Sequence, residues 1–361
     1  MSDILQTALR YLEEDVRPKA QAIDRDPEAL RDALRGLCNL ELMALKRPAS
    51  FGGPGLAESE FRTFQEEVAR ASGSLAFLQT QHQSAVSMLS KSENEGLKLR
   101  YLPHMANGEK LVGIGFSQLR RPGEPMMRAK AVDGGYELSG TVPWITGWSF
   151  YPEFLVGATL KSGEALFAVV PLENRSDKGS ISVSEPMRLA AMETAMTVSA
   201  EFQGWFVPDN DVAFIRQADW IRNNDLINIA LQGHFAIGCA LAGMDVLKSA
   251  SDKRGLPFLK NALDELHREL EDCRAATAKA QLGSGEEVTT DERLKVRAWA
   301  IDLAVRCAHA AVTASSGAAN SLEHPAQRIY REALVYTVSA QTTPIMEATL
   351  NRLVRSGQVR T

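Results

Sequence analysis

The chain has 361 residues, of which 45% are hydrophobic and 24% are charged. This composition excludes disordered, collagen-like and disulfide-scaffold proteins, and the length predicts two or three domains, or one composite domain, with a sizeable core. The net charge of -5, from 40 basic and 45 acidic residues, argues against a nucleic-acid partner, since such proteins usually carry a basic excess or patch.

The cysteines, histidines and hydropathy indicate the cellular setting. The six histidines show no spacing typical of metal ligands, so we predict no metal. There is no basic-then-apolar leader and no run of about 18 apolar residues, which predicts a cytoplasmic protein that does not bind membranes. Four widely separated cysteines form no CxxC pair and are expected to be buried and reduced: Cys38, Cys239, Cys273 and Cys307.

Residues 1–110 carry the pattern of amphipathic helices. Leucines recur every three or four positions in 5–12 and again in 30–37. The stretch 47–56 is rich in glycine and proline and is expected to be a loop. Helical spacing resumes in 61–68 and again after residue 90, so we predict an N-terminal all-α domain over 1–110.

The pattern changes to short β-rich segments over 111–214. Asp133-Gly134-Gly135 is typical of a tight turn between strands. We therefore predict a β domain over 111–214. The predicted strands lie at 111–116, 135–138, 154–157, 165–170 and 196–202.

Residues 215–361 return to helical spacing. An apolar run with helical period extends from Ile227 to Leu241, and 264–280 is a polar helix. A loop is expected at 281–287, and Thr289 with Glu292 predicts a capping box before the next helix. We predict a C-terminal helical bundle over 215–361, and the order helices, strands, helices predicts the α+β fold class.

Four segments together suggest a family. They are FGGPGL at 51–56, YLPHMANGEK at 101–110, DGGYELSGTVPWITG at 133–147, and the stretch 323–336 with its Glu-His-Pro and Arg-Glu-Ala motifs. In order and spacing the chain resembles the acyl-CoA dehydrogenase family of flavoproteins. The resemblance implies a helical domain, a β-sandwich or barrel, a four-helix bundle, and a homodimer or homotetramer. It also implies FAD, an acyl-CoA or acyl-like substrate and an electron acceptor.

The resemblance implies that a flavin lies at the ends of two strands. Backbone groups and hydroxyls there would face the polar edge of the flat ring. The residues alone leave open that Trp144 and Ile145 belong to the core of the β domain and that Thr146 merely ends a strand. The implied cofactor contacts are Phe116, Ser117, Trp144, Ile145, Thr146 and Thr342.

Two segments that would hold the other half of the cofactor are reduced. Lys253–Phe258 keeps an arginine and a phenylalanine of the family's motif. The glycine-rich turn is represented by Ser315–Ala319, with a single glycine where close backbone approach favours several. FAD is the predicted cofactor, with FMN or no flavin as alternatives.

The usual catalytic base is missing. The resemblance implies a glutamate that removes the α proton of an acyl thioester, but Ala340 stands there and cannot accept a proton. At the family's alternative position, on a helix of the bundle, stands Asn228. Asp225 lies three residues earlier on nearly the same helical face and is a weak candidate, with a solvated or capping role as the alternative.

Three residues are candidates for binding substrate. Arg120 and Arg121 replace small residues of a family loop. Two guanidinium groups can clamp a phosphate or carboxylate, or can simply be solvated. The resemblance places His82 beside the acyl pocket, as a polar pocket residue or as a surface histidine with its own partners.

The sequence therefore predicts a FAD-dependent oxidoreductase that acts on an acyl-CoA or acyl-like molecule without ordinary α,β-desaturation. One alternative is a flavin-dependent monooxygenase, which needs no base at the acyl α carbon and would draw on a flavin reductase. Another is a catalytically silent member that binds or scaffolds.

Overall fold

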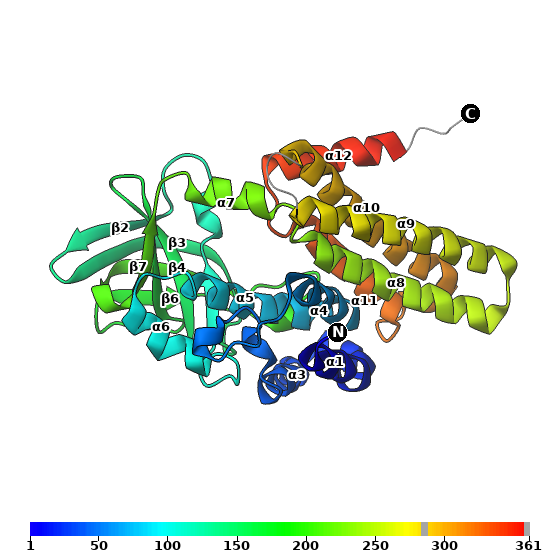
Figure 1. Cartoon of the computed structure of the whole chain (residues 1–361), viewed down its shortest axis with the longest axis horizontal. Helices are drawn as coiled ribbons and strands as arrows, with labels where there is room; N and C mark the ends of the chain where they lie inside the picture. The colour runs from blue at the N-terminus through cyan, green and yellow to red at the C-terminus, as the bar shows by residue number, and fades with distance from the viewer. Residues whose placement is uncertain (283–287, 357–361) are drawn as a thin grey trace.

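The computed structural model describes residues 1–282 and 288–356. The chain runs from N-terminal helices through a β-sheet to a second group of helices. The sheet lies at one end of the molecule and the long C-terminal helices at the other (Figure 1). The predicted order of helices, strands and helices is confirmed. Most of the loop expected at 281–287 lies outside the described residues.

The N-terminal part consists of α-helices joined by 3-10 and π-helical turns and by loops. Leu30, Leu34 and Leu37, which share one face of a helix, are at most 3% exposed. Asp26 caps the same helix by accepting a hydrogen bond from the amide of Glu28. The helices are α1 (Asp3–Tyr11), α2 (Ala20–Ile23), α3 (Pro27–Asn39), α4 (Glu58–Ala71), α5 (Gly73–Leu89) and α6 (Glu95–Tyr101).

The strands form one mixed sheet with the order β6-β7-β3-β2-β4-β5-β8, while β1 pairs with β4. Strands β1 and β2 are both parallel to β4, and the other neighbours are antiparallel. The strands are β1 (Val112–Gly115), β2 (Met127–Val132), β3 (Gly135–Thr146), β4 (Glu153–Leu160), β5 (Ala165–Pro171), β6 (Ser180–Val183), β7 (Thr197–Pro208) and β8 (Val212–Arg216).

The predicted tight turn joins β2 to β3. Val132 pairs with Gly135, and Gly134 has a φ of +75°, a conformation that glycine adopts readily. The prediction did not contain β2, β6 or β8, and β8 ends at Arg216, just past the predicted domain limit of 214.

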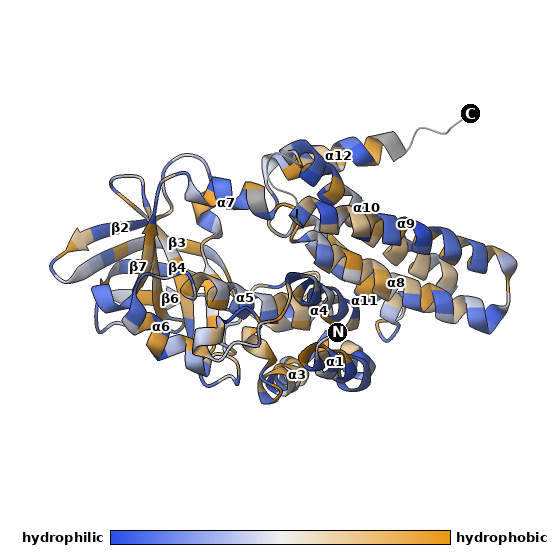
Figure 2. Ribbon diagram, in the orientation of Figure 1, coloured by the Kyte–Doolittle hydropathy of each residue, from blue (hydrophilic) through white to orange (hydrophobic). Residues whose placement is uncertain are grey.

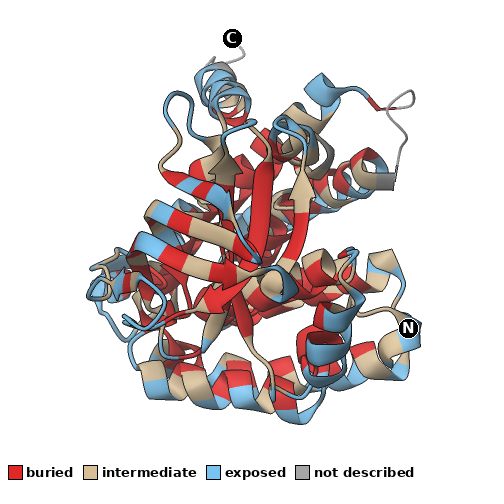
Figure 3. Cartoon of the chain, turned by 90° about the vertical axis from the view of Figure 1, so that its left-hand side faces the viewer, coloured by how far each residue is buried: buried red, intermediate tan, exposed pale blue. Residues whose placement is uncertain are grey.

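Apolar side chains form separate cores in the helices and in the sheet. Figure 2 shows hydrophobic residues along both the strands and the helices, and Figure 3 shows buried residues concentrated where strands and helices meet. A further cluster joins the two parts, with Leu89 of α5 and Leu97 of α6 packed with Leu155 and Phe167 of the sheet. Helix α5 therefore anchors the sheet to the helical part.

The C-terminal part is again helical, but its first helix is shorter than predicted. The apolar run from Ile227 to Leu241 is interrupted, because α7 ends at Asn228 and α8 begins at Gly233. The predicted capping box of Thr289 and Glu292 is confirmed. The helices are α7 (Trp220–Asn228), α8 (Gly233–Arg254), α9 (Pro257–Leu282), α10 (Thr290–Ser315), α11 (Pro325–Val338) and α12 (Thr343–Ser356).

Small residues let α8 lie close to its neighbours. A Cβ atom at Gly238 would lie 2.1 Å from the carbonyl oxygen of Glu66 on α4, and one at Gly243 would lie 2.7 Å from that of Cys307 on α10. The four cysteines are buried and free, as predicted.

Candidate functional site

The end of β1 presents a buried hydroxyl without a partner. The strand passes close to its neighbours because of Gly115, where a Cβ would lie 2.7 Å from the ring of Phe154. A short 3-10 turn, Ser117–Arg120, follows. The Oγ atom of Ser117 is buried and has no hydrogen-bond partner among the described residues. Such an orphaned group is costly to leave unpaired, so it suits a ligand that offers a polar edge.

The next residue, Gln118, holds the turn against the sheet. Its Nε2 donates to the carbonyl oxygens of Gly115, at 3.2 Å, and Gly157, at 2.7 Å. Its Oε1 is buried and, like the Ser117 hydroxyl, has no partner within the described residues. Two adjacent acceptor-bearing side chains are thus left with unused hydrogen-bonding capacity.

The end of β3 combines an exposed aromatic ring with a paired hydroxyl. Trp144 is 47% exposed, whereas Ile145 is fully buried in the apolar core of the sheet. The side chain of Ile145 therefore cannot contact a cofactor, and only its backbone remains for that purpose. The hydroxyls of Thr146 and Thr197 are 3.0 Å apart, so the Thr146 side chain already has a partner.

Backbone strain gathers around this pair of threonines. Ser149, Met192 and Met196 have φ values of +67°, +57° and +50°, a left-handed region that is unfavourable for residues with a Cβ. The amide of Gly147 donates to the carbonyl of Ala195, which ties the two strained loops together. Strained backbone of this kind clusters at binding sites.

Arg120 and Asp225 pair with each other. Nε and Nη2 of Arg120 donate to the two carboxylate oxygens of Asp225 at 2.7 and 2.8 Å, and the guanidinium lies 5.6 Å from the ring centre of Phe116. Arg121 is exposed and contacts the sulfur of Met126. The two arginines therefore do not form the predicted clamp, and the carboxylate of Asp225 is committed to a cation.

His82 has a structural role. It is 0% exposed; its Nδ1 accepts from the amide of Val112 at 3.0 Å and its Nε2 lies 3.0 Å from the carbonyl oxygen of Met105. Burial lowers the pKa of His82 to about 4, so the ring is neutral. It is neither a surface residue nor free to bind substrate.

Ala340 and Asn228, which stand where the family resemblance predicts a base, have different surroundings. Ala340 is exposed with a φ of +49°. The Nδ2 of Asn228 donates to the carbonyl of Asn224, one turn earlier in α7. Thr342 is half-buried just before α12, and its carbonyl accepts from the amide of Met346.

Two buried polar groups in the C-terminal helices were missed by the sequence reasoning. Arg297 of α10 lies beside the turn that carries Ala340, with bonds to the carbonyls of Tyr336 and Ser339. The Nδ1 atom of His234 on α8 lies 2.6 Å from a carboxylate oxygen of Glu66 on α4. A polar residue inside an otherwise helical pattern gives no signal of its burial, so only the structure identifies them.

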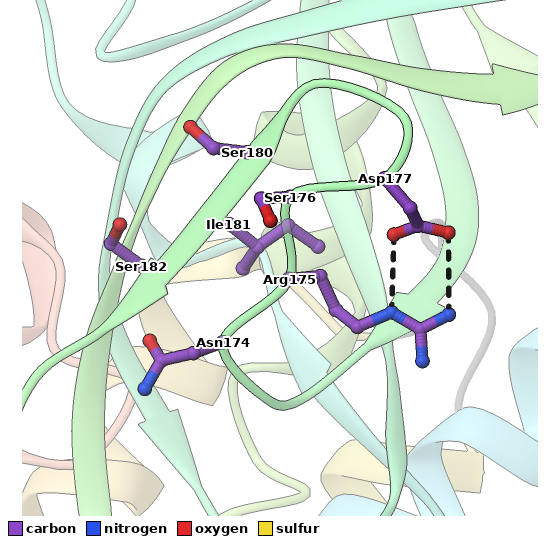
Figure 4. Close-up of a pocket in the computed structure, with 7 residues that line it drawn as sticks. All are labelled: Asn174, Arg175, Ser176, Asp177, Ser180, Ile181 and Ser182. Atoms are coloured by element: carbon purple, nitrogen blue, oxygen red, sulfur yellow. Dashed lines mark hydrogen bonds and ion pairs between the residues drawn. The ribbon is translucent and has the colours of Figure 1, made fainter.

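A shallow depression of about 710 Å³ lies in the β domain and is lined by residues 174–177 and 180–182. Figure 4 shows that its charged groups, Arg175 and Asp177, pair with each other. None of the predicted site residues lines it, so we assign it no role. No cluster of three or more potential metal ligands occurs within 1–282 and 288–356. No helix in the described part of the chain is long and apolar enough to cross a membrane.

Solved structures show that this arrangement of helices and sheet is the acyl-CoA dehydrogenase fold. The butyryl-CoA dehydrogenase of Megasphaera elsdenii superimposes with a TM-score of 0.80 at 19% identity, covering 98% of this chain and 99% of that one. An acyl-CoA dehydrogenase from Bacillus anthracis complexed with FAD has a TM-score of 0.79 at 19% identity, covering 98% of this chain and 66% of that one.

Sequence comparisons agree. The family model for the acyl-CoA dehydrogenase N-terminal domain matches residues 2–109. The benzylmalonyl-CoA dehydrogenase of Aromatoleum aromaticum is 25% identical over 98% of this chain and 97% of its own. The isovaleryl-CoA dehydrogenase of Pongo abelii is 34% identical, but the match covers only 39% of this chain and 35% of that protein. The match over residues 2–109 and the similarity over nearly the whole chain to an acyl-CoA dehydrogenase support membership of the acyl-CoA dehydrogenase family.

Proposed function

We propose that this chain is a FAD-dependent oxidoreductase that acts on an acyl-CoA or acyl-like molecule and does not carry out ordinary α,β-desaturation. Two features support the proposal. The end of β1 keeps a buried hydroxyl that has no partner among the described residues, and Ala340 stands where the family resemblance predicts the base.

The residues at the strand ends fit a flavin. The free hydroxyl of Ser117 and the exposed ring of Trp144 suit a flat group with apolar faces and a polar edge, and Thr342 would add a hydroxyl from the other side. The side chain of Phe116, which is held under Arg120, would border the same site. When bound, the flavin would supply the electron acceptor for substrate oxidation.

No acid among the candidates is placed to remove a proton from the substrate. Both oxygens of Asp225 are bound by Arg120, and the side chain of Asn228 cannot act as a base. Loss of a positioned base costs roughly 10²–10⁴-fold in rate. The proposal therefore retains redox chemistry and excludes efficient desaturation.

The visible spectrum of the purified protein tests the cofactor. We expect a yellow protein, or a colourless one that binds added FAD with quenched flavin fluorescence. Saturated acyl-CoAs mixed with the flavin-loaded protein in a stopped-flow instrument should not bleach it within the time of a normal turnover. Rapid bleaching would refute the loss of desaturation, and a protein that cannot be loaded with FAD or FMN would refute the whole proposal.

We further propose that the chain assembles as a homodimer or homotetramer through α11 and α12. Members of the family form oligomers. These two consecutive helices carry large apolar side chains at helical spacing that are 44–73% exposed: Tyr330, Leu334, Val338, Met346, Leu350, Leu353 and Val354. Large apolar side chains that are exposed in this number are typical of an interface.

A further inference from the structure

Arg297 is a buried cation without an acidic partner among the described residues. The residue is 1% exposed on α10. Burial lowers its pKa to about 9, and no carboxylate of the described residues offsets this. Its Nε and Nη1 atoms have no hydrogen-bond partner in the described part of the chain. An unpaired buried charge is unfavourable for folding, so its presence points to a specific task.

The contacts that Arg297 does make converge on the end of α11. Its Nη2 lies 3.3 Å from the carbonyl oxygen of Tyr336 and 3.2 Å from that of Ser339. The last carbonyls of a helix lack intrahelical partners and carry its partial negative charge. The guanidinium therefore caps α11 from a neighbouring helix.

The backbone that follows this cap is strained. Ala340 has a φ of +49°, which is unfavourable for a residue with a Cβ. Two residues later the carbonyl of Thr342 accepts from the amide of Met346, which begins α12. Strained turns persist only where their surroundings hold them. Arg297 holds the turn that contains Ala340 through its bond to the carbonyl of Ser339, the first residue of that turn.

Packing alone does not account for an arginine here. Ile301, one turn along the same face of α10, joins Ile229 and Ile345 in an apolar cluster. A methionine would fill a similar volume beside such a cluster. What only a cationic donor adds is the pair of bonds to the two carbonyls.

We propose that Arg297 is a positioning residue that clamps the turn 339–342 and thereby fixes where Thr342 is presented. That the fixed hydroxyl serves a flavin rests on the proposed function. The clamp itself does not, because it concerns only contacts within the chain.

The test compares Arg297→Met with Arg297→Lys in two measurements. Hydrogen exchange of the amides in 339–343, measured without cofactor, should become about tenfold faster in the Met variant, because bonds to a charged donor are lost. The Kd for FAD should rise by about the same factor, and Lys should restore both to within about threefold of wild type. Ile301→Val is the control for loosened packing and should leave the exchange of this turn unchanged relative to the rest of α11.

Each outcome separates the clamp from the cofactor. Unchanged exchange in the Met variant, or no rescue by Lys, overturns the clamp. Faster exchange with an unchanged FAD Kd overturns the link to the flavin. Should the wild-type chain bind no FAD at all, the proposed function fails while exchange still decides the clamp. Arg297→Gln replaces the Met variant, with the same expectation, if circular dichroism shows that the latter does not fold.

Discussion

Ala340 lies in an exposed, left-handed turn, at the position where the family resemblance predicts the catalytic base. We expect Ala340→Glu to gain flavin reduction by a saturated acyl-CoA. A carboxylate placed at the family's base position can take the α proton, and such a base contributes roughly 10²–10⁴-fold in rate. The measurement is the rate of flavin bleaching after rapid mixing.

The matched control is Ala340→Gln, which adds the same bulk without a basic group. Equal rates for the Glu and Gln variants would contradict the argument, because a steric effect would then explain the change. A Glu variant that loads with FAD but stays as slow as wild type would show that more than the base is missing.

His82 makes stability depend on pH. Its folded pKa of about 4 lies below the ordinary value of 6.5, so the unfolded chain takes up this proton first as the pH falls. The contribution of the neutral His82 ring to the free energy of unfolding is fully present above pH 6.5 and is lost as the pH falls from 6.5 to about 4. A pKa shift of this size corresponds to about 3 kcal/mol. Urea unfolding at pH 7 and pH 4.5 should show a smaller loss for His82→Gln than for wild type.

Only local roles of single residues could be predicted from the sequence. The capping box of Thr289 and Glu292 involves neighbours three residues apart, and it is where the pattern placed it. His82, in contrast, is satisfied by backbone atoms of Met105 and Val112, and Arg120 by an aspartate 105 residues away. Such partners are brought together by the fold, and nothing in the local pattern reveals them.

Helix α7 connects the sheet to the C-terminal helices (Figure 1). The Arg120–Asp225 pair fastens this helix to the turn after β1. Both side chains are about one-fifth to one-quarter exposed, at 24% and 20%. A bidentate pair in this setting should be worth about 1 kcal/mol. We expect the cycle of Arg120→Ala, Asp225→Ala and the double variant to show a coupling of about this size in the free energy of unfolding.

The charge-swapped variant, with Asp at 120 and Arg at 225, is the control for that cycle. It should recover part of the lost stability, since attraction between the two positions is kept. Additive single effects and no recovery on swapping would mean that the pair does not hold α7 in place.

Elements with a regular apolar pattern could be predicted, and those that depend on neighbours could not. Strand β2 alternates with Arg128 and Lys130, so its composition resembles a loop, yet it is held by pairing with β3 and β4. The break between α7 and α8 is likewise hidden, because apolar residues continue across it. In both cases contacts with another element decide the local structure, and a short stretch of sequence does not contain that element.

At the scale of the molecule, the change from helical to alternating period and back was sufficient to predict three successive parts. Their mutual arrangement was not, since it depends on contacts such as the cluster joining α5 to Leu155 and Phe167. The same is true of surfaces: the exposure of the apolar side chains of α11 and α12 is recognised only once both helices are in place.

The exposed apolar side chains of α11 and α12 lead to a prediction about assembly. Leu334 on α11 and Leu350 on α12 are 52% and 55% exposed, and a second copy of the chain would bury both. Introducing charge at the centre of an apolar interface leaves it unpaired and desolvated, which costs several kcal/mol. We therefore expect Leu334→Asp combined with Leu350→Asp to convert an oligomer into a monomer in size-exclusion chromatography with light scattering.

Leu99→Asp, at a 64% exposed position on α6, is the control and should leave the mass unchanged. A wild-type chain that is monomeric at micromolar concentration would contradict the assembly, and dissociation by the α6 variant alone would place the interface elsewhere.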